Sequence, residues 1–231
     1  MMNMMYLGPS ERRNFLDEMT LKAFPEYKKV FSNFKKVLQS RNKLLRNISE
    51  KKSDISELSF WNEKYITLAA EVYTYRNKSI CFLEEQCPEL KSYFFGKVEK
   101  LQFQYISKIS PDTAWDEIRN YITQNIEKEI LLRKTLRWPH LDDFDILVDT
   151  IPLIHFASRG EVKSIILGLK FIETLFIENS SSKQEILFLI DDLLSELDWD
   201  HRSMLWQHIW NRQCVITSIE DLEIPGNKIF I

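Results

Sequence analysis

Hydrophobic residues recur at intervals of three and four through the first hundred positions, and this spacing predicts a helical arm. A short helical pattern follows Ser10, and after Pro25 an amphipathic pattern continues for about six turns. A polar break at residues 49–56 precedes a second long helix, and Pro88 is expected near the start of a further short one. The apolar positions of the two long helices are Val30, Phe34, Val37, Leu38, Leu44, Leu45 and Ile48, then Leu58, Trp61, Leu68, Val72 and Ile80.

The pattern changes after Lys100, where apolar and polar residues alternate as in a half-buried strand. The unbroken apolar run at residues 186–190 predicts a strand buried on both faces of a mainly parallel sheet. Strands and helices then alternate, which indicates an α/β class with an arm at residues 9–99 and a second unit at 100–231. The other expected elements are strands at 101–105, 144–148, 151–156 and 214–217, a helix after Asp112, helices from Gly160 and over 202–210, and a loop at 179–182.

Charge is distributed unevenly along the chain, although the net charge is only −3. Residues 1–60 carry 12 basic and 7 acidic side chains, whereas residues 141–200 carry 4 and 13. Basic residues on a helix usually form a solvated face, but on a single face they would contact phosphates with little sequence preference. The basic set is Arg12, Arg13, Lys28, Lys29, Lys35, Lys36, Lys43, Lys51 and Lys52.

Glycine and cysteine usage excludes several classes of site. The five glycines lie at positions 8, 96, 160, 168 and 226, so neither a G-x-x-x-x-G-K-[ST] phosphate loop nor G-x-G-x-x-G is present. Three cysteines without a C-x-x-C pair argue against a disulfide framework and a zinc knuckle. With no signal-peptide pattern and no apolar run of about 20 residues, we expect a cytoplasmic protein without a membrane span.

Two acidic residues, Asp191 and Asp192, end the apolar run at residues 186–190. Ligands of open α/β sheets bind beyond the carboxyl ends of strands, where Asp191 could help to hold Mg²⁺ and Asp192 could orient an attacking water. The alternative is a pair that ends a strand and caps the next helix.

A second candidate site is Ala157-Ser158-Arg159-Gly160, directly before a predicted helix. A hydroxyl and free backbone N–H groups at a helix N-terminus attract anions, and a glycine lets a phosphate approach. The alternative is that Ser158 is an ordinary N-cap. If Ser158 binds a phosphate and the acidic pair binds Mg²⁺ and water, we expect them to line one shared nucleotide pocket.

Taken in order, these pieces resemble the head of ABC-type ATPases, and more narrowly the RecF family. Pro9, Arg12, Arg13, Phe15, Leu16 and Asp17 match the family's P-x-x-R-R-x-F-L-D segment, and Leu38, Arg41, Asn42, Leu44 and Leu45 match L-x-x-R-N-x-L-L. Trp61 and Arg76 fall in its next helices, and Pro139, His140, Asp142 and Asp143 resemble G-P-H-R-D-D. Ala157, Ser158 and Gly160 resemble A-S-Q-G, and residues 191–198 match D-D-x-x-S-E-L-D.

The resemblance implies a partial ABC-ATPase head with an α-helical arm, and it assigns roles residue by residue. Asp191 would be the Walker B magnesium ligand, Asp192 the catalytic acid and Asp198 a D-loop residue at a head-to-head dimer. Ser158 and Gly160 would contact the γ-phosphate of ATP held by the opposite subunit. The family binds DNA at gaps and single-strand/double-strand junctions, works with RecO and RecR in replication, recombination and repair, and takes part in the SOS response.

Departures from the family pattern limit these implications. Because the P-loop is missing, we expect ATP and Mg²⁺ to bind only with a separate P-loop polypeptide. Arg159 and Glu161 replace glutamines of the signature, and an acid near a γ-phosphate would repel it. Two alternatives remain: an ATPase-inactive module for DNA or protein binding, and a poorly folded remnant whose parallel strands lack neighbours.

Overall fold

The structure is a computed structural model that describes residues 8–92, 98–107, 113–137, 139–180, 186–191, 199–209 and 212–219. Helices dominate, and the strands form two small sheets. The elements are α1 (Pro9–Ala23), α2 (Tyr27–Ser49), the 3-10 turn η1 (Ile55–Glu57), α3 (Leu58–Glu85), α4 (Cys87–Ser92), β1 (Leu101–Ile106), α5 (Ala114–Leu132), β2 (Asp143–Val148), β3 (Ile151–Pro152), α6 (Leu153–Phe156), α7 (Arg159–Ser180), β4 (Phe188–Asp191), α8 (Trp199–Ile209) and β5 (Cys214–Thr217).

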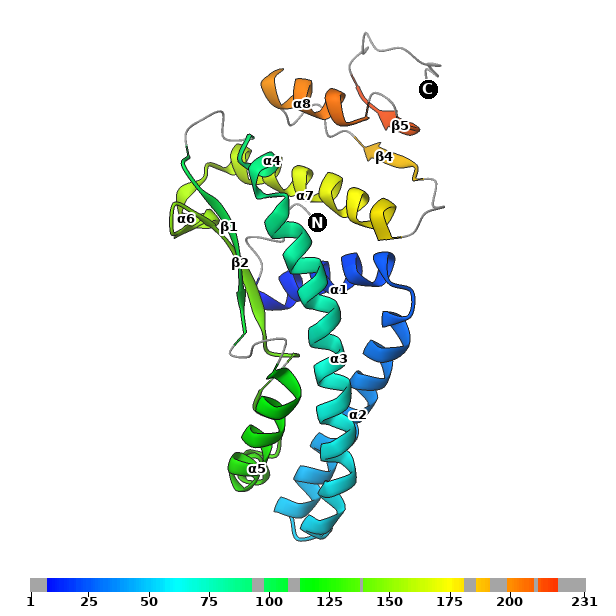
Figure 1. Cartoon of the computed structure of the whole chain (residues 1–231), viewed down its shortest axis with the longest axis vertical. Coiled ribbons are helices and arrows are strands. Elements are labelled where there is room, and N and C mark those ends of the chain that lie inside the picture. Colours follow the sequence, from blue (N-terminus) through cyan, green and yellow to red (C-terminus); the bar gives the residue numbers. More distant parts are fainter. Residues whose placement is uncertain are drawn as a thin grey trace.

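Within the arm predicted at residues 9–99, α2 and α3 lie side by side, and α5 packs against both at the lower end of the molecule (Figure 1). The apolar stripe of α2 meets that of α3 because both repeat every three to four residues. Phe34, Tyr65 and Ile118 lie in the shared core and are each at most 1% exposed. The two long helices are confirmed, including the polar break between them.

A second core joins the arm to an antiparallel sheet. Strands β1 and β2 pair from Leu101 opposite Val148 to Ile106 opposite Asp143. Their alternating apolar residues face α1, α4 and α7, so that Phe103 and Phe144 contact helical residues such as Phe15. The core therefore contains residues from both sides of the boundary expected near residue 100, and that division of the chain stays a prediction.

The segment at residues 151–156 is not a strand throughout, which corrects the sequence interpretation. Only Ile151 and Pro152 pair with β2, and α6 follows at once. Asp149 and Thr150 have φ values of 48° and 81°, the left-handed geometry of a tight hairpin between β2 and β3. Pro152 cannot donate a ladder hydrogen bond, so the strand ends there.

Strands β4 and β5 pair in parallel, from Phe188 opposite Cys214 to Asp191 opposite Thr217. The parallel pairing fits the prediction, but the predicted burial of β4 on both faces is wrong. One face packs through Ile190 against Phe171 of α7, while Leu187 and Leu189 are 49% and 75% exposed. The sheet that contains β4 is therefore parallel in its described part, as predicted, whereas β1, β2 and β3 form a separate antiparallel sheet.

The class predicted from the sequence, α/β with a helical arm, is confirmed. Within the described ranges, no helix is long and apolar enough to cross a bilayer.

Candidate functional site

Ser158 lies at the amino end of α7 and caps this helix. Its carbonyl accepts a hydrogen bond from the N–H of Val162, and its Oγ accepts one from the N–H of Glu161 at 3.3 Å. The Glu161 carboxylate accepts the N–H of Ser158 in return at 2.9 Å. This reciprocal pair of hydrogen bonds is a capping box. Ser158 is therefore an N-cap, as the alternative interpretation of the sequence predicted. A carboxylate therefore already lies at the helix end where an anion was expected.

Gly160 lies in the first turn of α7 and is exposed. A Cβ atom built at this position meets no other atom within 4 Å, so the chain's own packing does not require a glycine. A requirement for glycine here would have to come from something that approaches the helix from outside.

Asp191 is the last residue of β4 and is exposed at the carboxyl end of the parallel pair. Its Oδ1 accepts a hydrogen bond of 2.6 Å from the Oγ1 of Thr217 on the adjacent strand. A carboxylate and a hydroxyl at this edge are both hard oxygen donors of the kind Mg²⁺ prefers, so the residues present fit a magnesium ligand. The predicted Asp192 and Asp198 lie outside the described residues.

Among the described residues, no hydrogen bond joins Asp191 to Ser158. Phe188 of β4 packs on Phe171, with ring centroids 5.7 Å apart, and Phe171 is 13 residues beyond Ser158. At 1.5 Å per residue, Ser158 therefore lies about 20 Å along α7 from the point where β4 packs. Figure 1 shows β4 above the later part of α7, whereas the start of α7 lies near α6.

Several motif residues of the first helices hold the arm against the sheet. The buried Arg76 donates to both carboxylate oxygens of Asp17 at 2.8 and 2.9 Å. Arg12 donates to Asp143 at 2.8 Å, and Arg13 donates to the carbonyl of Asp142 at 2.8 Å. Arg12 and Arg13 are half-buried and bound to these acceptors, which corrects their assignment to the basic face of the arm.

Asp142 is the hydrogen-bond acceptor at the centre of this joint, the contact between the arm and the antiparallel sheet. Its carboxylate accepts hydrogen bonds from Tyr73 at 2.5 Å and Tyr105 at 3.1 Å. Burial raises the pKa of Asp142 above its ordinary value, although the Tyr73 hydroxyl and the nearby Arg76 partly oppose this. Burial also raises the pKa of both tyrosines, so that they remain neutral donors at physiological pH.

A second buried network fixes the far end of the arm. Arg41 donates to Glu129 of α5 at 2.5 Å, and both side chains are fully buried. It also donates to Asn62 of α3 and to Thr135, whose own N–H and hydroxyl reach Asn42. Arg41 could be singled out from the sequence, but these partners were not predicted. The available signal was a charged residue within the apolar stripe of α2, which implies a buried acid opposite.

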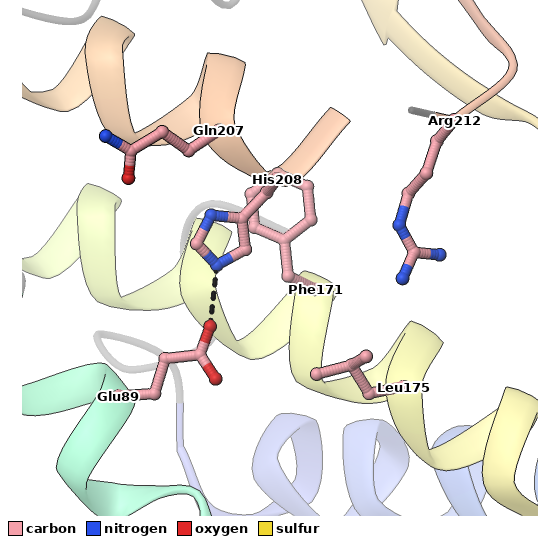
Figure 2. A pocket seen from close by; sticks show the side chains of 6 residues that line it. All are labelled: Glu89, Phe171, Leu175, Gln207, His208 and Arg212. Carbon is pink, nitrogen blue, oxygen red and sulfur yellow. Dashed lines mark hydrogen bonds and ion pairs between the residues drawn. The ribbon is translucent and has the colours of Figure 1, made fainter. Parts of the chain in front are cut away.

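Figure 2 shows a pocket of about 270 Å³ that none of the predicted site residues lines. His208 of α8 bonds to Glu89 of α4 at 2.8 Å and packs on Phe171, with ring centroids 4.6 Å apart. Arg212 is held by Glu178 of α7. These contacts join α8 to the rest of the molecule, so we assign the pocket a structural role. In the part of the chain that the structure covers, no cluster of three or more His, Cys, Asp or Glu residues could hold a metal ion.

The fold, with long helices packed against an antiparallel sheet and a separate parallel strand pair, is similar to that of two solved structures. It superimposes on the solved structure of the recombination mediator protein RecF with ATP in the RecFOR pathway, with a TM-score of 0.84 and 23% identity over 98% of this chain. A second RecF structure of that pathway gives a TM-score of 0.82.

Sequence comparison agrees with the fold. The chain is 30% identical over 216 residues to the DNA replication and repair protein RecF of Ruminiclostridium cellulolyticum, 31% identical over 233 residues to that of Acetivibrio thermocellus and 32% identical over 224 residues to that of Lactobacillus johnsonii. These alignments cover 91–96% of the chain but only 58–62% of the relatives. No protein-family model matches. The chain is thus similar to RecF proteins, in sequence and in fold, over nearly its whole length.

Proposed function

We propose that this chain acts in DNA repair and recombination in the manner of RecF and contributes part of an ATP site. The observation that supports this most strongly is the similarity to RecF over nearly the whole chain, in sequence and in fold. The chain spans about three fifths of the relatives' length, so the activity of a whole RecF is attributed to it only as part of this proposal.

In the proposed site, Asp191 holds Mg²⁺ through a carboxylate oxygen, and its Thr217 hydrogen bond orients the carboxylate. Asp192 acts as the catalytic acid that polarises the attacking water, and Asp198 acts at the D-loop of a head dimer. Ser158 and Gly160 face the γ-phosphate of the ATP held by the opposite subunit. The separation between Ser158 and the point where β4 packs on α7 is compatible with this division between subunits.

The β- and γ-phosphates are held by a separate polypeptide that carries a P-loop. The glycine spacing of this chain contains no such loop. Parallel strands are normally covered on both faces, whereas Leu189 and Val215 on the outer face of the β4–β5 pair are 75% and 54% exposed. We infer that the P-loop polypeptide covers this face.

Further partners follow from the same proposal. The chain binds DNA at gaps or single-strand/double-strand junctions, works with RecO and RecR, and forms a head-to-head dimer when ATP is bound. The proposed setting is cytoplasmic, with a role in the SOS response. The similar solved structure belongs to the RecFOR pathway, which supports RecO and RecR as partners.

The test is ATP hydrolysis by this chain mixed with the P-loop segment of the Lactobacillus johnsonii relative. We expect Mg²⁺-dependent hydrolysis that is lost in Asp192→Asn, because the variant cannot polarise water. Asp116→Asn, an exposed change on α5, is the matched control and should hydrolyse ATP at the parent rate. Equal rates for parent and Asp192→Asn would contradict the catalytic role.

One observation favours a second candidate, an ATPase-inactive module for DNA or protein binding. Glu161 places a carboxylate at the amino end of α7, where it competes with a phosphate for the same N–H groups. For such a module, hydrolysis would be absent with every partner segment, and Asp192→Asn would change nothing.

A further inference from the structure

The outer face of α2 carries a dense row of positive charge. Between Tyr27 and Ser49 this helix contains no Asp or Glu. Six of its cationic side chains are exposed, and they stand within an arc of about 120° at roughly 100° per residue. We call this set the α2 basic face; its members are Lys28, Lys29, Lys35, Lys36, Lys43 and Arg46.

The position of this face is fixed by the packing of the arm. Val37 and Leu44, on the opposite side of α2, are buried against the rest of the arm. The apolar stripe therefore directs the basic residues straight into solvent. Figure 1 shows α2 along the outer edge of the arm, away from α7 and the β4–β5 pair.

The charges of the α2 basic face are largely uncompensated among the described residues, although Arg46 is near enough to Glu50 to help lower the pKa of that carboxyl. No ion pair joins any of the six to a carboxylate in the ranges that the structure describes. Glu50, just beyond the helix, is bound by Lys52 and Arg133. Lys35 lies over the ring of Phe31 at 4.1 Å, which holds its ammonium group in position without cancelling its charge.

We propose that the α2 basic face binds the sugar–phosphate backbone of duplex DNA. From Lys28 to Arg46 it extends about 27 Å, which matches about eight base pairs along the duplex. Lys29, Lys36 and Lys43 are seven residues apart and form one straight line of donors. Such contacts fix the position of a duplex but carry no sequence information. The proposal rests on the DNA-binding part of the proposed function and names the surface responsible.

The chemistry of the helix argues against an anionic membrane as the partner. A helix that lies on a bilayer inserts an apolar face between the lipids. The apolar face of α2 is already buried against the arm, so only charge is available outside. Polar residues such as Ser32 and Asn33 separate the lysines and can donate further hydrogen bonds to phosphate oxygens.

Fluorescence anisotropy with a labelled 30-base-pair duplex tests the proposal on the full chain over a series of salt concentrations. The test variant is Lys29→Gln, Lys36→Gln and Lys43→Gln. We expect at least tenfold weaker binding at low salt, and a salt slope lower by about 0.9 for each phosphate that the variant no longer neutralises. The control variant removes the same charge from exposed lysines outside α2, with Lys100→Gln, Lys128→Gln and Lys134→Gln, and should bind like the parent.

Each of the other outcomes shows which part of the proposal is wrong. If the test variant binds with the parent's affinity and slope, the α2 basic face is not the DNA site, although DNA binding itself stands. If both triple variants weaken binding equally, only net charge acts and the proposal is overturned. If the parent binds no duplex, or binds phosphatidylserine vesicles or a 30-nucleotide single strand more tightly, the duplex assignment falls. Unchanged thermal unfolding of the variants excludes misfolding as the cause.

Discussion

Asp17 and Arg76 form an ion pair whose side chains are 8% and 2% exposed, and Tyr27 donates a further hydrogen bond to the same carboxylate. Removing one partner of such a pair leaves a buried charge without compensation. Asp17→Asn should therefore lower the free energy of unfolding by about 3–5 kcal/mol, as measured by urea denaturation.

The control for this change is Glu63→Gln, because Glu63 pairs with Arg119 at a site where the two side chains are 54% and 39% exposed. Surface pairs contribute less than about 1 kcal/mol. If Asp17→Asn cost no more than this control, the joint between arm and sheet would not depend on the buried pair.

Asp142 makes the stability of the joint depend on pH. Because burial raises the pKa of this carboxyl above its ordinary value of 3.8, the folded chain holds the proton more tightly than the unfolded chain does. Its contribution to stability is complete below that ordinary value and is lost as the pH rises through the raised pKa. The parent should lose stability relative to Asp142→Asn as the pH rises.

The measurement is the free energy of unfolding of both proteins at intervals from about pH 3.5 to about pH 7, compared as a difference so that the other titrating groups cancel. A difference that stays flat, or that moves in favour of the parent as the pH rises, would show that burial does not dominate the pKa of Asp142.

Among the elements, α7 depends on an N-cap at its amino end, and this capping role of Ser158 can be tested without any nucleotide. Ser158→Ala removes the acceptor for the Glu161 N–H, and the loss of an N-cap costs about 0.5–2 kcal/mol. Thermal unfolding monitored by circular dichroism should show this loss, whereas Ser158→Asp, which restores an acceptor, should retain most of the stability. Equal stability of Ser158→Ala and the parent would exclude the capping role.

The long elements could be predicted from the sequence because an amphipathic pattern repeated over many turns has few alternative interpretations. The short segment at 151–156 could not, since an apolar run of six residues fits a strand and a helix equally well. Burial of β4 was also mispredicted. An apolar run indicates that both faces of a strand can be buried, but it does not reveal whether residues of the same chain bury both faces.

The candidate site was predictable in part. The acidic residue at the end of β4 and the serine at the start of α7 are where the pattern placed them, since strand ends and helix caps have local sequence signals. The networks around Arg41 and Asp142 join residues far apart in sequence, and no local pattern encodes which partner each will meet. Arg12 and Arg13 were misassigned for the same reason: their acceptors on β2 and just before it are about 130 residues away.

For the whole molecule, the exposed outer face of the β4–β5 pair is the surface at which we expect self-association. Exposed apolar strands associate with other chains. Leu189→Gln should reduce self-association in light scattering at high protein concentration without a loss of stability, because the side chain is 75% exposed. The same change should weaken binding of the P-loop segment.

Ile190→Gln is the contrasting variant, because Ile190 is only 8% exposed and its replacement should destabilise the protein. If Leu189→Gln left both self-association and segment binding unchanged, the outer face would not be the docking surface of the P-loop segment.

We propose that the chain supplies one part of an ATP site and that a P-loop segment absent from this sequence binds the phosphates. Titration of fluorescent ATP in the presence of Mg²⁺, first into the chain alone and then into the chain mixed with the P-loop segment of a RecF relative, tests it most directly. We predict no saturable binding by the chain alone, and binding by the mixture that exceeds that of the segment and weakens in Asp191→Asn. Tight, magnesium-dependent binding by the chain alone would contradict the account.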